Sequence, residues 1–203
     1  LTLSMAMDLF ELGSTEEKLC DTLAASTCRW LVLSASSDWL FPPRQSREVV
    51  DALIKARKYV SYCNIQSGGG HDAFLIPGEA ESFGAMTKAF IESTTPDAQY
   101  LPLTEIKPAH DATDDTPHVM RRHRVDYDRL LDLIHPGESV LDLGCGRGEL
   151  LSRIAYEKGS DRLVGLELDE AKIQKTLQGG FDVIQADLNE GLLESSDKEF
   201  DLV

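Results

Sequence analysis

Apolar positions along this chain follow two patterns, one typical of buried strands and one typical of amphipathic helices. The continuous apolar run at 30–35 predicts a strand that is buried on both faces, and 59–65 predicts a second strand. Around them, apolar residues recur at helical spacing, which predicts helices over 15–25, 47–58 and 79–91. Strands that alternate with helices indicate an α/β fold with a parallel sheet. The helix positions expected in the core are Leu19, Leu23, Ala24, Val50, Leu53, Ile54, Ala56, Phe83, Met86, Ala89 and Phe90.

The regular pattern stops at residue 95 and resumes at Val125. The stretch between contains four prolines among polar residues, which predicts an extended linker at 95–123. Beyond it we predict helices at 126–134, 149–157 and 170–177, and strands at 139–143, 163–168 and 181–186, with Tyr127, Leu130, Leu131 and Ile134 buried. The chain thus divides into a first domain at 1–94, the linker, and a second domain at 124–203. Residues 200–203 resemble the start of a further strand, so we expect a piece of a larger protein.

The composition, 42% hydrophobic and 27% charged, is that of a globular protein. The net charge of −15, from 35 acidic and 20 basic residues, repels phosphate backbones and anionic lipids, so we expect neither nucleic acid nor membrane as a partner. No run approaches the roughly eighteen apolar residues that a membrane span needs. No basic segment with an apolar stretch behind it follows Leu1, so we expect no secretory signal in these residues.

The four cysteines show no C-x-x-C pair and no spacing with histidines that is typical of zinc, so we expect no metal. Cys20, Cys28 and Cys63 lie in apolar segments and are predicted to be small core residues. Free thiols of this kind indicate a reducing compartment, the cytoplasm.

A glycine-rich turn follows the strand predicted at 139–143. Gly144, Gly146 and Gly148 allow the backbone to turn sharply and to approach a ligand closely. The dinucleotide-binding pattern G-x-G-x-x-G would place its third glycine at Glu149, where a carboxylate would face a pyrophosphate. The spacing therefore argues against a nicotinamide dinucleotide.

Acidic residues stand at the carboxyl ends of three successive strands, where open α/β sheets bind ligands. S-adenosylmethionine has no phosphate but carries an ammonium, a ribose diol and an adenine. Asp142 could hold the ammonium, Glu167 could accept both ribose hydroxyls, and Asp187 could accept from the adenine amino group. The alternative is that each acid caps the following helix. Three such acids beside a three-glycine turn favour a cofactor site.

This region resembles the class I S-adenosylmethionine-dependent methyltransferases, and more narrowly the methionine-biosynthesis MetW family. The residues that carry the resemblance are 124–127, 136–151, 165–169, 179–187 and 200–203. The resemblance implies the first βα units of a Rossmann-like fold and S-adenosylmethionine as the ligand. The glycine motif is common to the whole superfamily, so it specifies the cofactor but no methyl acceptor.

A second candidate site lies in the first domain. Asp38 follows the strand at 30–35, and His71 follows the strand at 59–65 after three glycines. Both therefore lie at the same edge of the sheet, as an Asp–His pair requires: the carboxylate orients the imidazole, whose other nitrogen takes a proton from a nucleophile. Either residue alone is better explained as an ordinary loop residue, but together they favour a catalytic pair.

The residues around this pair, at 37–46 and 70–75, resemble homoserine O-acetyltransferase, an α/β-hydrolase-fold enzyme of methionine biosynthesis. The resemblance covers 1–92 and includes 7–13, which is similar to the return from the lid to the core. It implies the C-terminal part of an α/β-hydrolase fold, with Asp38 and His71 as triad acid and base and Asp72 as a contact to homoserine. It also implies acetyl-CoA as acyl donor and a homodimer through this domain.

No G-x-S-x-G elbow occurs in the 203 residues, so we expect the nucleophile upstream of Leu1 and no acetyl transfer by this chain alone. The leading hypothesis is a fragment of a fused methionine-biosynthesis protein. The alternative is that the methyltransferase-like half is a non-catalytic regulatory or scaffolding module of the acyltransferase. A generic hydrolase fused to an unrelated methyltransferase ranks last. Acetyl and succinyl donors both remain open.

Overall fold

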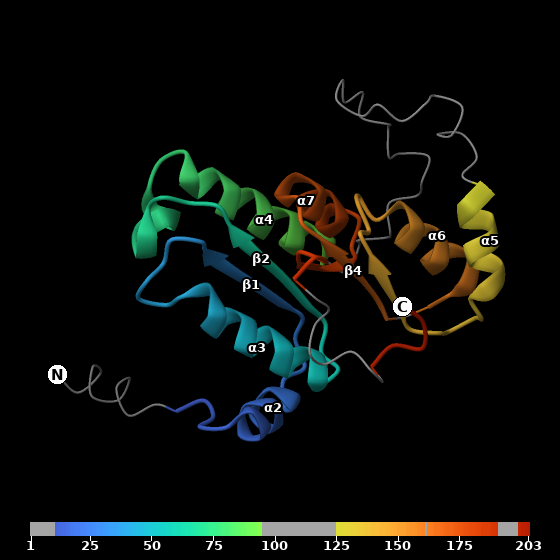
Figure 1. Cartoon of the computed structure of the whole chain (residues 1–203), viewed down its shortest axis with the longest axis horizontal. Coiled ribbons are helices and arrows are strands. Elements are labelled where there is room, and N and C mark those ends of the chain that lie inside the picture. The colour runs from blue at the N-terminus through green and yellow to red at the C-terminus, as the bar shows by residue number, and fades with distance from the viewer. Residues whose placement is uncertain (1–10, 95–124, 161, 191–198) are drawn as a thin grey trace. The chain divides into compact units, whose positions relative to one another are not determined.

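The computed structural model of the chain describes residues 11–94, 125–160, 162–190 and 199–203 (Figure 1). The chain divides into two compact units at a boundary between Phe83 and Gly84. The predicted linker at 95–123 and the segment 7–10 lie outside the described residues.

The first unit is built on a pair of parallel strands. Its elements in chain order are α2 (Glu16–Ala24), β1 (Trp30–Ala35), α3 (Pro43–Lys55), β2 (Val60–Ile65), a 3-10 helix η1 (Gly70–Leu75) and the start of α4 (Glu79–Ser93). β1 and β2 pair in parallel from Trp30 opposite Val60 to Ala35 opposite Ile65. The strand–helix–strand order predicted from the apolar pattern is therefore confirmed, and both strands end at the same edge.

Helix α3 differs from its prediction at both ends. It begins at Pro43, four residues before the predicted start, because proline at the first helical position has the φ that a helix needs and lacks only an N–H that would be unpaired. It ends at Lys55, since Arg57 has a left-handed φ of 54° that no α-helix accommodates. The predicted range of 47–58 is wrong by four residues at the start and three at the end.

The core of the first unit lies between α3 and β2. Val50, Leu53 and Ile54 are buried, as predicted, together with Cys63 and Ile65. The first four residues of β1 are only half-buried among the described residues. The prediction that this strand is covered on both faces is therefore wrong. Five other predicted core residues also differ: Ala24 and Cys28 are exposed, and Leu19, Cys20 and Ala56 are half-buried. Ala24 and Cys28 lie at and just beyond the end of α2, where the apolar face of that helix stops.

The second unit is a parallel sheet with β4 in the middle. Its elements are α5 (Val125–Leu133), β3 (Val140–Leu143), α6 (Glu149–Lys158), β4 (Leu163–Glu167), α7 (Glu170–Gln178) and β5 (Asp182–Gln185). β3 and β5 both pair in parallel with β4, which is buried along its whole length. On the other side of β3, Val140 forms a parallel bridge to Leu202, as a strand start at 200–203 predicts. The arrangement is the predicted Rossmann-like one.

Helices α6 and α7 fill the core of this unit with fully buried side chains. These are Leu151 and Ile154 from α6 and Ile173 and Leu177 from α7, each at most 1% exposed. Each such side chain stabilises the fold by about 1.5–3 kcal/mol relative to an exposed position. Leu131 of α5 is buried as predicted, as is Ile134 just after the end of this helix. Leu130 is 41% exposed and Tyr127 is only half-buried, so those two predictions are wrong.

In α4, Met86 and Ala89 are buried as predicted, whereas Phe83 and Phe90 are only half-buried. The parallel α/β arrangement holds for both units. The assignment of the first unit to the α/β-hydrolase fold remains a prediction.

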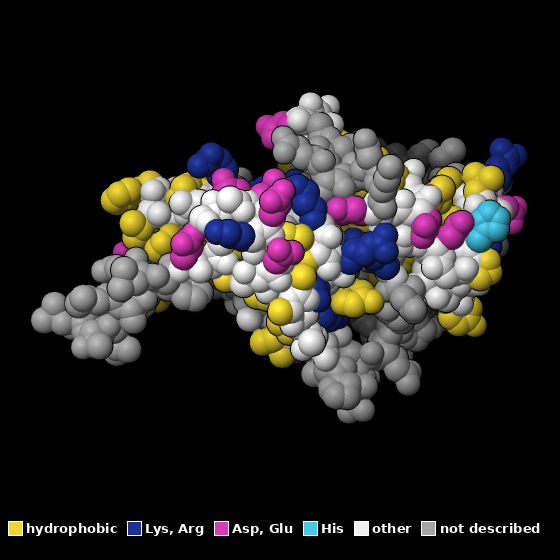
Figure 2. All heavy atoms as spheres, turned by 90° about the horizontal axis from the view of Figure 1, so that it is seen from below, with side chains coloured by type: hydrophobic (Ala, Val, Ile, Leu, Met, Phe, Trp, Pro, Cys, Tyr) yellow, Lys and Arg dark blue, Asp and Glu magenta, His cyan; other side chains and the backbone are white. Residues whose placement is uncertain are grey.

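The surface carries charges of both signs. On the face drawn in Figure 2, Lys and Arg side chains are interspersed with Asp and Glu, so the net negative charge does not form one continuous acidic patch there. Among the described residues, no helix is both long and apolar enough to cross a membrane.

Candidate functional site

The predicted Asp38–His71 pair forms in the first unit. Nδ1 of His71 lies 3.1 Å from Oδ2 of Asp38, although 33 residues separate them. The other carboxylate oxygen, Oδ1, accepts hydrogen bonds of 2.9 Å from the backbone N–H groups of Leu40 and Phe41. Asp38 is thus held by the turn after β1, and its side chain is only 12% exposed.

The backbone around His71 is a tight turn rather than an open loop. His71 lies in the first turn of η1, directly after Gly70, whose φ of +64° is in the region that favours glycine. The backbone N–H of Gly70 donates a 2.8 Å hydrogen bond to Oγ of Ser37, next to Asp38. The two loops are therefore fastened to each other beside the pair.

Aromatic rings flank the imidazole. The ring of Phe41 is 5.1 Å from that of His71, and the ring of Phe74 is 6.3 Å away in an edge-on arrangement. They leave the His71 side chain 38% exposed. No described residue hydrogen-bonds to its Nε2, so this nitrogen is open to a substrate or to a nucleophile from elsewhere.

The electrostatics of Asp38 favour a charged carboxylate. The hydrogen bond from the Phe41 N–H lowers the pKa of Asp38 below its ordinary value; partial burial opposes this, and the bonds from His71 and Leu40 lower the pKa further. An ionised Asp38 keeps the proton of the neutral imidazole on Nδ1, which leaves Nε2 as a proton acceptor. This is the chemistry expected of a general base.

Asp72, the predicted homoserine contact, follows His71 in η1 and is exposed. No described residue pairs with its carboxylate. It is therefore available to a cationic group, and its predicted role stays a prediction.

The glycine turn in the second unit has the predicted conformation. Gly144, Gly146 and Gly148 all have positive φ, of +79°, +61° and +79°. The first turn of the loop is tied to the central strand, because the N–H groups of Gly144 and Cys145 both donate to the carbonyl of Leu166 at 2.9 Å. Gly148 then forms the left-handed start of α6.

Glu167, at the end of β4, is joined to this loop. Its Oε2 accepts a 3.0 Å hydrogen bond from the N–H of Gly146, and Oε1 accepts from the N–H groups of Leu168 and Asp169. The amine of Lys172 is 4.0 Å from Oε2. The cap of α7 is Asp169 and not Glu167, so the alternative that Glu167 caps the helix is wrong.

Asp142 lies beside Glu167 at the same edge. The two residues are in neighbouring strands, and Asp142 is paired with Gly165, two residues before Glu167. Burial, and secondarily the charge of Glu167, raise the pKa of Asp142 to about 6. No described residue donates a hydrogen bond to its carboxylate. A cationic ligand would relieve this unfavourable charge.

Asp187 follows β5 by two residues. Its Oδ1 accepts hydrogen bonds from the backbone N–H and the side-chain amide of Asn189, at 2.9 and 2.8 Å. This oxygen therefore stabilises a turn, whereas the capping alternative places the acid at the start of a following helix, and no helix follows β5 among the described residues. Its second oxygen has no hydrogen bond from a described residue.

Two further residues shape the glycine turn and were not found from the sequence. Thr176, fully buried in α7, donates a 3.0 Å hydrogen bond from Oγ1 to the carbonyl of Gly146. Cys145 packs against Gly165 of β4, where an added Cβ would lie 2.3 Å from its sulfur. Burial, and then the charge of Asp142, raise the pKa of the Cys145 thiol to about 12, so it is a packing residue and not a nucleophile. Both contacts are tertiary, and no local sequence signal predicts them.

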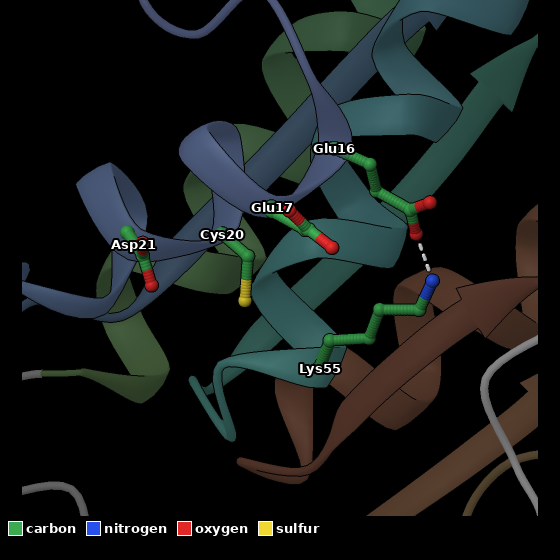
Figure 3. Close-up of a pocket in the computed structure, with 5 residues that line it drawn as sticks. All are labelled: Glu16, Glu17, Cys20, Asp21 and Lys55. Carbon is green, nitrogen blue, oxygen red and sulfur yellow. Dashed lines mark hydrogen bonds and ion pairs between the residues drawn. The ribbon is translucent and has the colours of Figure 1, made fainter.

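A groove between α2 and α3 is lined by Glu16, Glu17, Cys20, Asp21 and Lys55 (Figure 3). Lys55 reaches across it to form an ion pair with Glu16. Neither in this groove nor elsewhere among the described residues are His, Cys, Asp and Glu side chains arranged to hold a metal ion.

Comparison with known proteins finds relatives for the chain. Residues 124–203 match the family model described as methionine biosynthesis protein MetW. A protein of Rhodopirellula baltica, named bifunctional methionine biosynthesis protein MetXA/MetW, is 41% identical over 210 residues, which cover 100% of this chain and 31% of that protein.

Part of the chain is also similar to homoserine O-succinyltransferases. Those of Litchfieldella anticariensis and Hahella chejuensis are 49% and 44% identical over 78 residues, which cover 38% of this chain and 20% of each enzyme. The predicted resemblance to a homoserine acyltransferase joined to a MetW protein is confirmed. The chain spans less than a third of the length of the relatives that it matches. None of these names favours the alternative of a regulatory module.

Proposed function

We propose that this chain belongs to a methionine-biosynthesis protein that transfers an acyl group to the hydroxyl of homoserine and that carries an S-adenosylmethionine-binding domain. The observation that carries the first part is the 3.1 Å contact between Asp38 and His71 at adjacent strand ends. The similarity to homoserine O-succinyltransferases and to a MetXA/MetW protein supports the same substrate.

In the proposed reaction, a serine outside this chain attacks the acyl thioester, and His71 takes the proton of its hydroxyl at Nε2. The proton passes to the departing thiolate of coenzyme A as the acyl-serine forms. The hydroxyl of homoserine then attacks the acyl-serine, His71 takes that proton, and the serine oxygen recovers it as O-acylhomoserine leaves. Asp38 stabilises the imidazolium in both halves, and Asp72 holds the homoserine ammonium.

The acyl donor in this proposal is acetyl-CoA, as the resemblance of the loops around Asp38 and His71 implies. The names of the succinyl-transferring relatives support the acyl acceptor, homoserine, but give succinyl-CoA as the competing donor. A direct comparison of the two thioesters decides between them.

The first test is the coding sequence upstream of Leu1, which must encode a glycine-flanked serine after a strand. The protein that carries this serine is then assayed for release of coenzyme A with homoserine and either thioester. We expect His71→Ala and Asp38→Asn to lower kcat by about 10³-fold or more. His135→Ala is the matched control, because the His135 side chain is exposed and its ring pairs with Glu138, far from the Asp38–His71 pair in the sequence. A native reading frame that starts near Leu1 would exclude acyl transfer by this protein.

For the second unit, we propose S-adenosylmethionine as the ligand, held by Asp142 at its ammonium, by Glu167 at its ribose and by Asp187 at its adenine. Gly144, Gly146 and Gly148 would allow the close approach of the backbone. The donor set fits this ligand, since Asp142 and Glu167 place two acidic groups together and no described residue donates a hydrogen bond to Asp142. When bound, S-adenosylmethionine supplies a methyl group on a sulfonium cation.

Binding of S-adenosylmethionine to this chain is measured by titration calorimetry at pH 7.5. We expect Asp142→Asn to weaken binding by about tenfold or more, because a charged hydrogen bond is lost. Asp132→Asn is the control, since Asp132 is exposed on α5. Equal affinities of the wild type and Asp142→Asn would contradict the assignment of Asp142 to the ligand.

A further inference from the structure

A polar network behind the Asp38–His71 pair ties the two loops of the site to each other. Ser36 donates from Oγ to the carbonyl of Ser67 at 3.2 Å, and the N–H of Ser67 donates back to the same Oγ at 3.0 Å. Beside them, Ser37 accepts the N–H of Gly70 at 2.8 Å. The loop after β1 is therefore bonded to the loop after β2 at two points.

The loop at 67–70, which leads into His71 and is called the glycine loop below, has a third attachment through Glu79. Oε2 of this first residue of α4 accepts a hydrogen bond from the hydroxyl of Ser67 and a 3.3 Å bond from the N–H of Gly69. Oγ of Ser67 in turn accepts the N–H of Gly69 at 3.0 Å. One carboxylate oxygen thus holds the segment that leads into His71.

The loop closes tightly around this carboxylate. A Cβ on Gly69 would lie 2.8 Å from Oε2 of Glu79 and 2.5 Å from the Cδ1 of Ile76. The residue after Gly69 is Gly70, whose left-handed backbone turns the chain directly into His71. A change in the position of Gly69 is therefore transmitted to the imidazole through two peptide units.

We propose that Glu79 is a positioning residue for His71: by holding Ser67 and Gly69, it keeps Nδ1 of the imidazole on the Asp38 carboxylate. The inference rests on the proposed acyl transfer, in which that contact selects the reactive tautomer. Glu79 does not touch the imidazole itself, so it acts through the glycine loop.

A purely structural role for Glu79 would have a different consequence. A carboxylate in the first turn of a helix is favourable near the N-terminal end of the helix dipole whatever else it contacts. Glu81 lies in the same first turn, is exposed and carries the same charge. Replacing Glu81 removes the dipole contribution without touching the glycine loop, which makes it the matched control.

The readout is the tautomer of His71 in this chain, measured from the ¹⁵N shifts of its ring nitrogens at a pH where the ring is neutral. We expect the wild type to show the Nδ1–H tautomer and Asp38→Asn to lose it. In Glu79→Ala we expect the ratio of Nδ1–H to Nε2–H to fall roughly fivefold, less than the full contribution of a hydrogen bond to a carboxylate, because the bonds to Ser67 and Ser37 still hold the loop. Glu79→Gln should restore most of the ratio, because its amide oxygen can accept the same two hydrogen bonds, and Glu81→Ala should leave the ratio unchanged.

The outcomes separate the two proposals. A wild-type chain without the Nδ1–H tautomer would contradict the Asp38–His71 pair itself and, with it, the proposed acyl transfer. A wild type with the tautomer and an unchanged ratio in Glu79→Ala would overturn only the role of Glu79. Should Glu79→Ala fail to fold, Ser67→Ala removes the hydroxyl that donates to Glu79 and accepts from Gly69, and leaves only the 3.3 Å bond between Gly69 and Glu79. An unchanged ratio in both Ser67→Ala and Glu79→Gln, compared with the wild type and Asp38→Asn, would then overturn the proposal.

Discussion

The replacement of Asp142 by Asn should stabilise the second unit near neutral pH. In the folded chain, burial and the neighbouring charge of Glu167 raise the pKa of Asp142 from 3.8 to about 6. At about 1.4 kcal/mol for each tenfold change in proton affinity, this corresponds to at most about 3 kcal/mol. Because the side chain is only half-buried and retains some water, we expect a gain of about 1–2 kcal/mol in the free energy of unfolding at pH 7.

The sign of the effect follows from the direction in which the pKa moves. Folding raises this pKa, so the folded state binds the proton more tightly than the unfolded state does. The stability that the protonated carboxyl allows is fully present below pH 3.8 and is lost as the pH rises through about 6. Asparagine cannot ionise, so the advantage of the variant over the wild type should grow by roughly 1 kcal/mol between pH 5 and pH 7.

The assay is unfolding by urea from pH 5 to pH 8, followed through the amide resonances of β4, which report on the second unit alone. The range stops at pH 5 because the isoelectric point of the sequence is about 4.6 and solubility is lowest there. Asp132→Asn changes the net charge by the same amount at an exposed site and serves as the control. Other titrating groups are shared with the wild type and cancel in the difference.

Two results would refute the reasoning about Asp142. The first is an Asp142→Asn variant whose difference from the wild type does not change between pH 5 and pH 7, since no raised pKa could then be present. The second is a variant that is less stable than the wild type at pH 7, which would mean that the carboxylate has a stabilising partner in the folded chain.

Three further predictions concern the second unit. The affinity for S-adenosylmethionine, measured by titration calorimetry, should fall roughly tenfold from pH 7 to pH 5 as Asp142 takes up a proton, and this fall should be absent in Asp142→Asn. In urea unfolding, Gly165→Ala should lower the free energy of unfolding by about 1–3 kcal/mol, because its Cβ would collide with the Cys145 side chain. Gly84→Ala is the control: it lies in a helix with open space around it and should raise the free energy of unfolding by about 0.5–1 kcal/mol. Asp169→Ala should cost about 1 kcal/mol through loss of the α7 cap, seen as faster amide exchange at Lys172.

The order of strands and helices could be predicted from the sequence because it depends on local periodicity. Each strand predicted in the described residues is present, and the helices differ mainly at their ends. The errors have tertiary causes. The end of α3 depends on the left-handed backbone at Arg57, a residue type with no preference for that region. The exposure of Leu130 and Ala24 depends on which neighbouring elements cover each helix face, and helical spacing alone does not contain that information.

At the candidate sites too, the local features could be predicted from the sequence and the tertiary contacts could not. Acids at strand ends and glycines in turns are local signals, and they correctly located Asp38, His71 and the loop around Gly146. The residues that hold these groups in place are Thr176 and Glu79, which lie 30 and 10 residues from the loops that they contact. A hydroxyl or carboxylate in a helix has many possible partners, so only the folded chain identifies the one that it contacts.

The choice between an acid that caps a turn and an acid that serves a site is not exclusive in this protein. Asp38 uses Oδ1 to accept two backbone N–H groups of the following turn and Oδ2 to meet His71. Glu167 divides its oxygens in the same way, with Oε1 on the following turn and Oε2 on Gly146. In each case one oxygen fixes the carboxylate so that the other has a defined direction. Substitution of either acid should therefore cost stability and function together, whereas Asp142, which no described residue hydrogen-bonds, should lose ligand affinity while the fold gains stability.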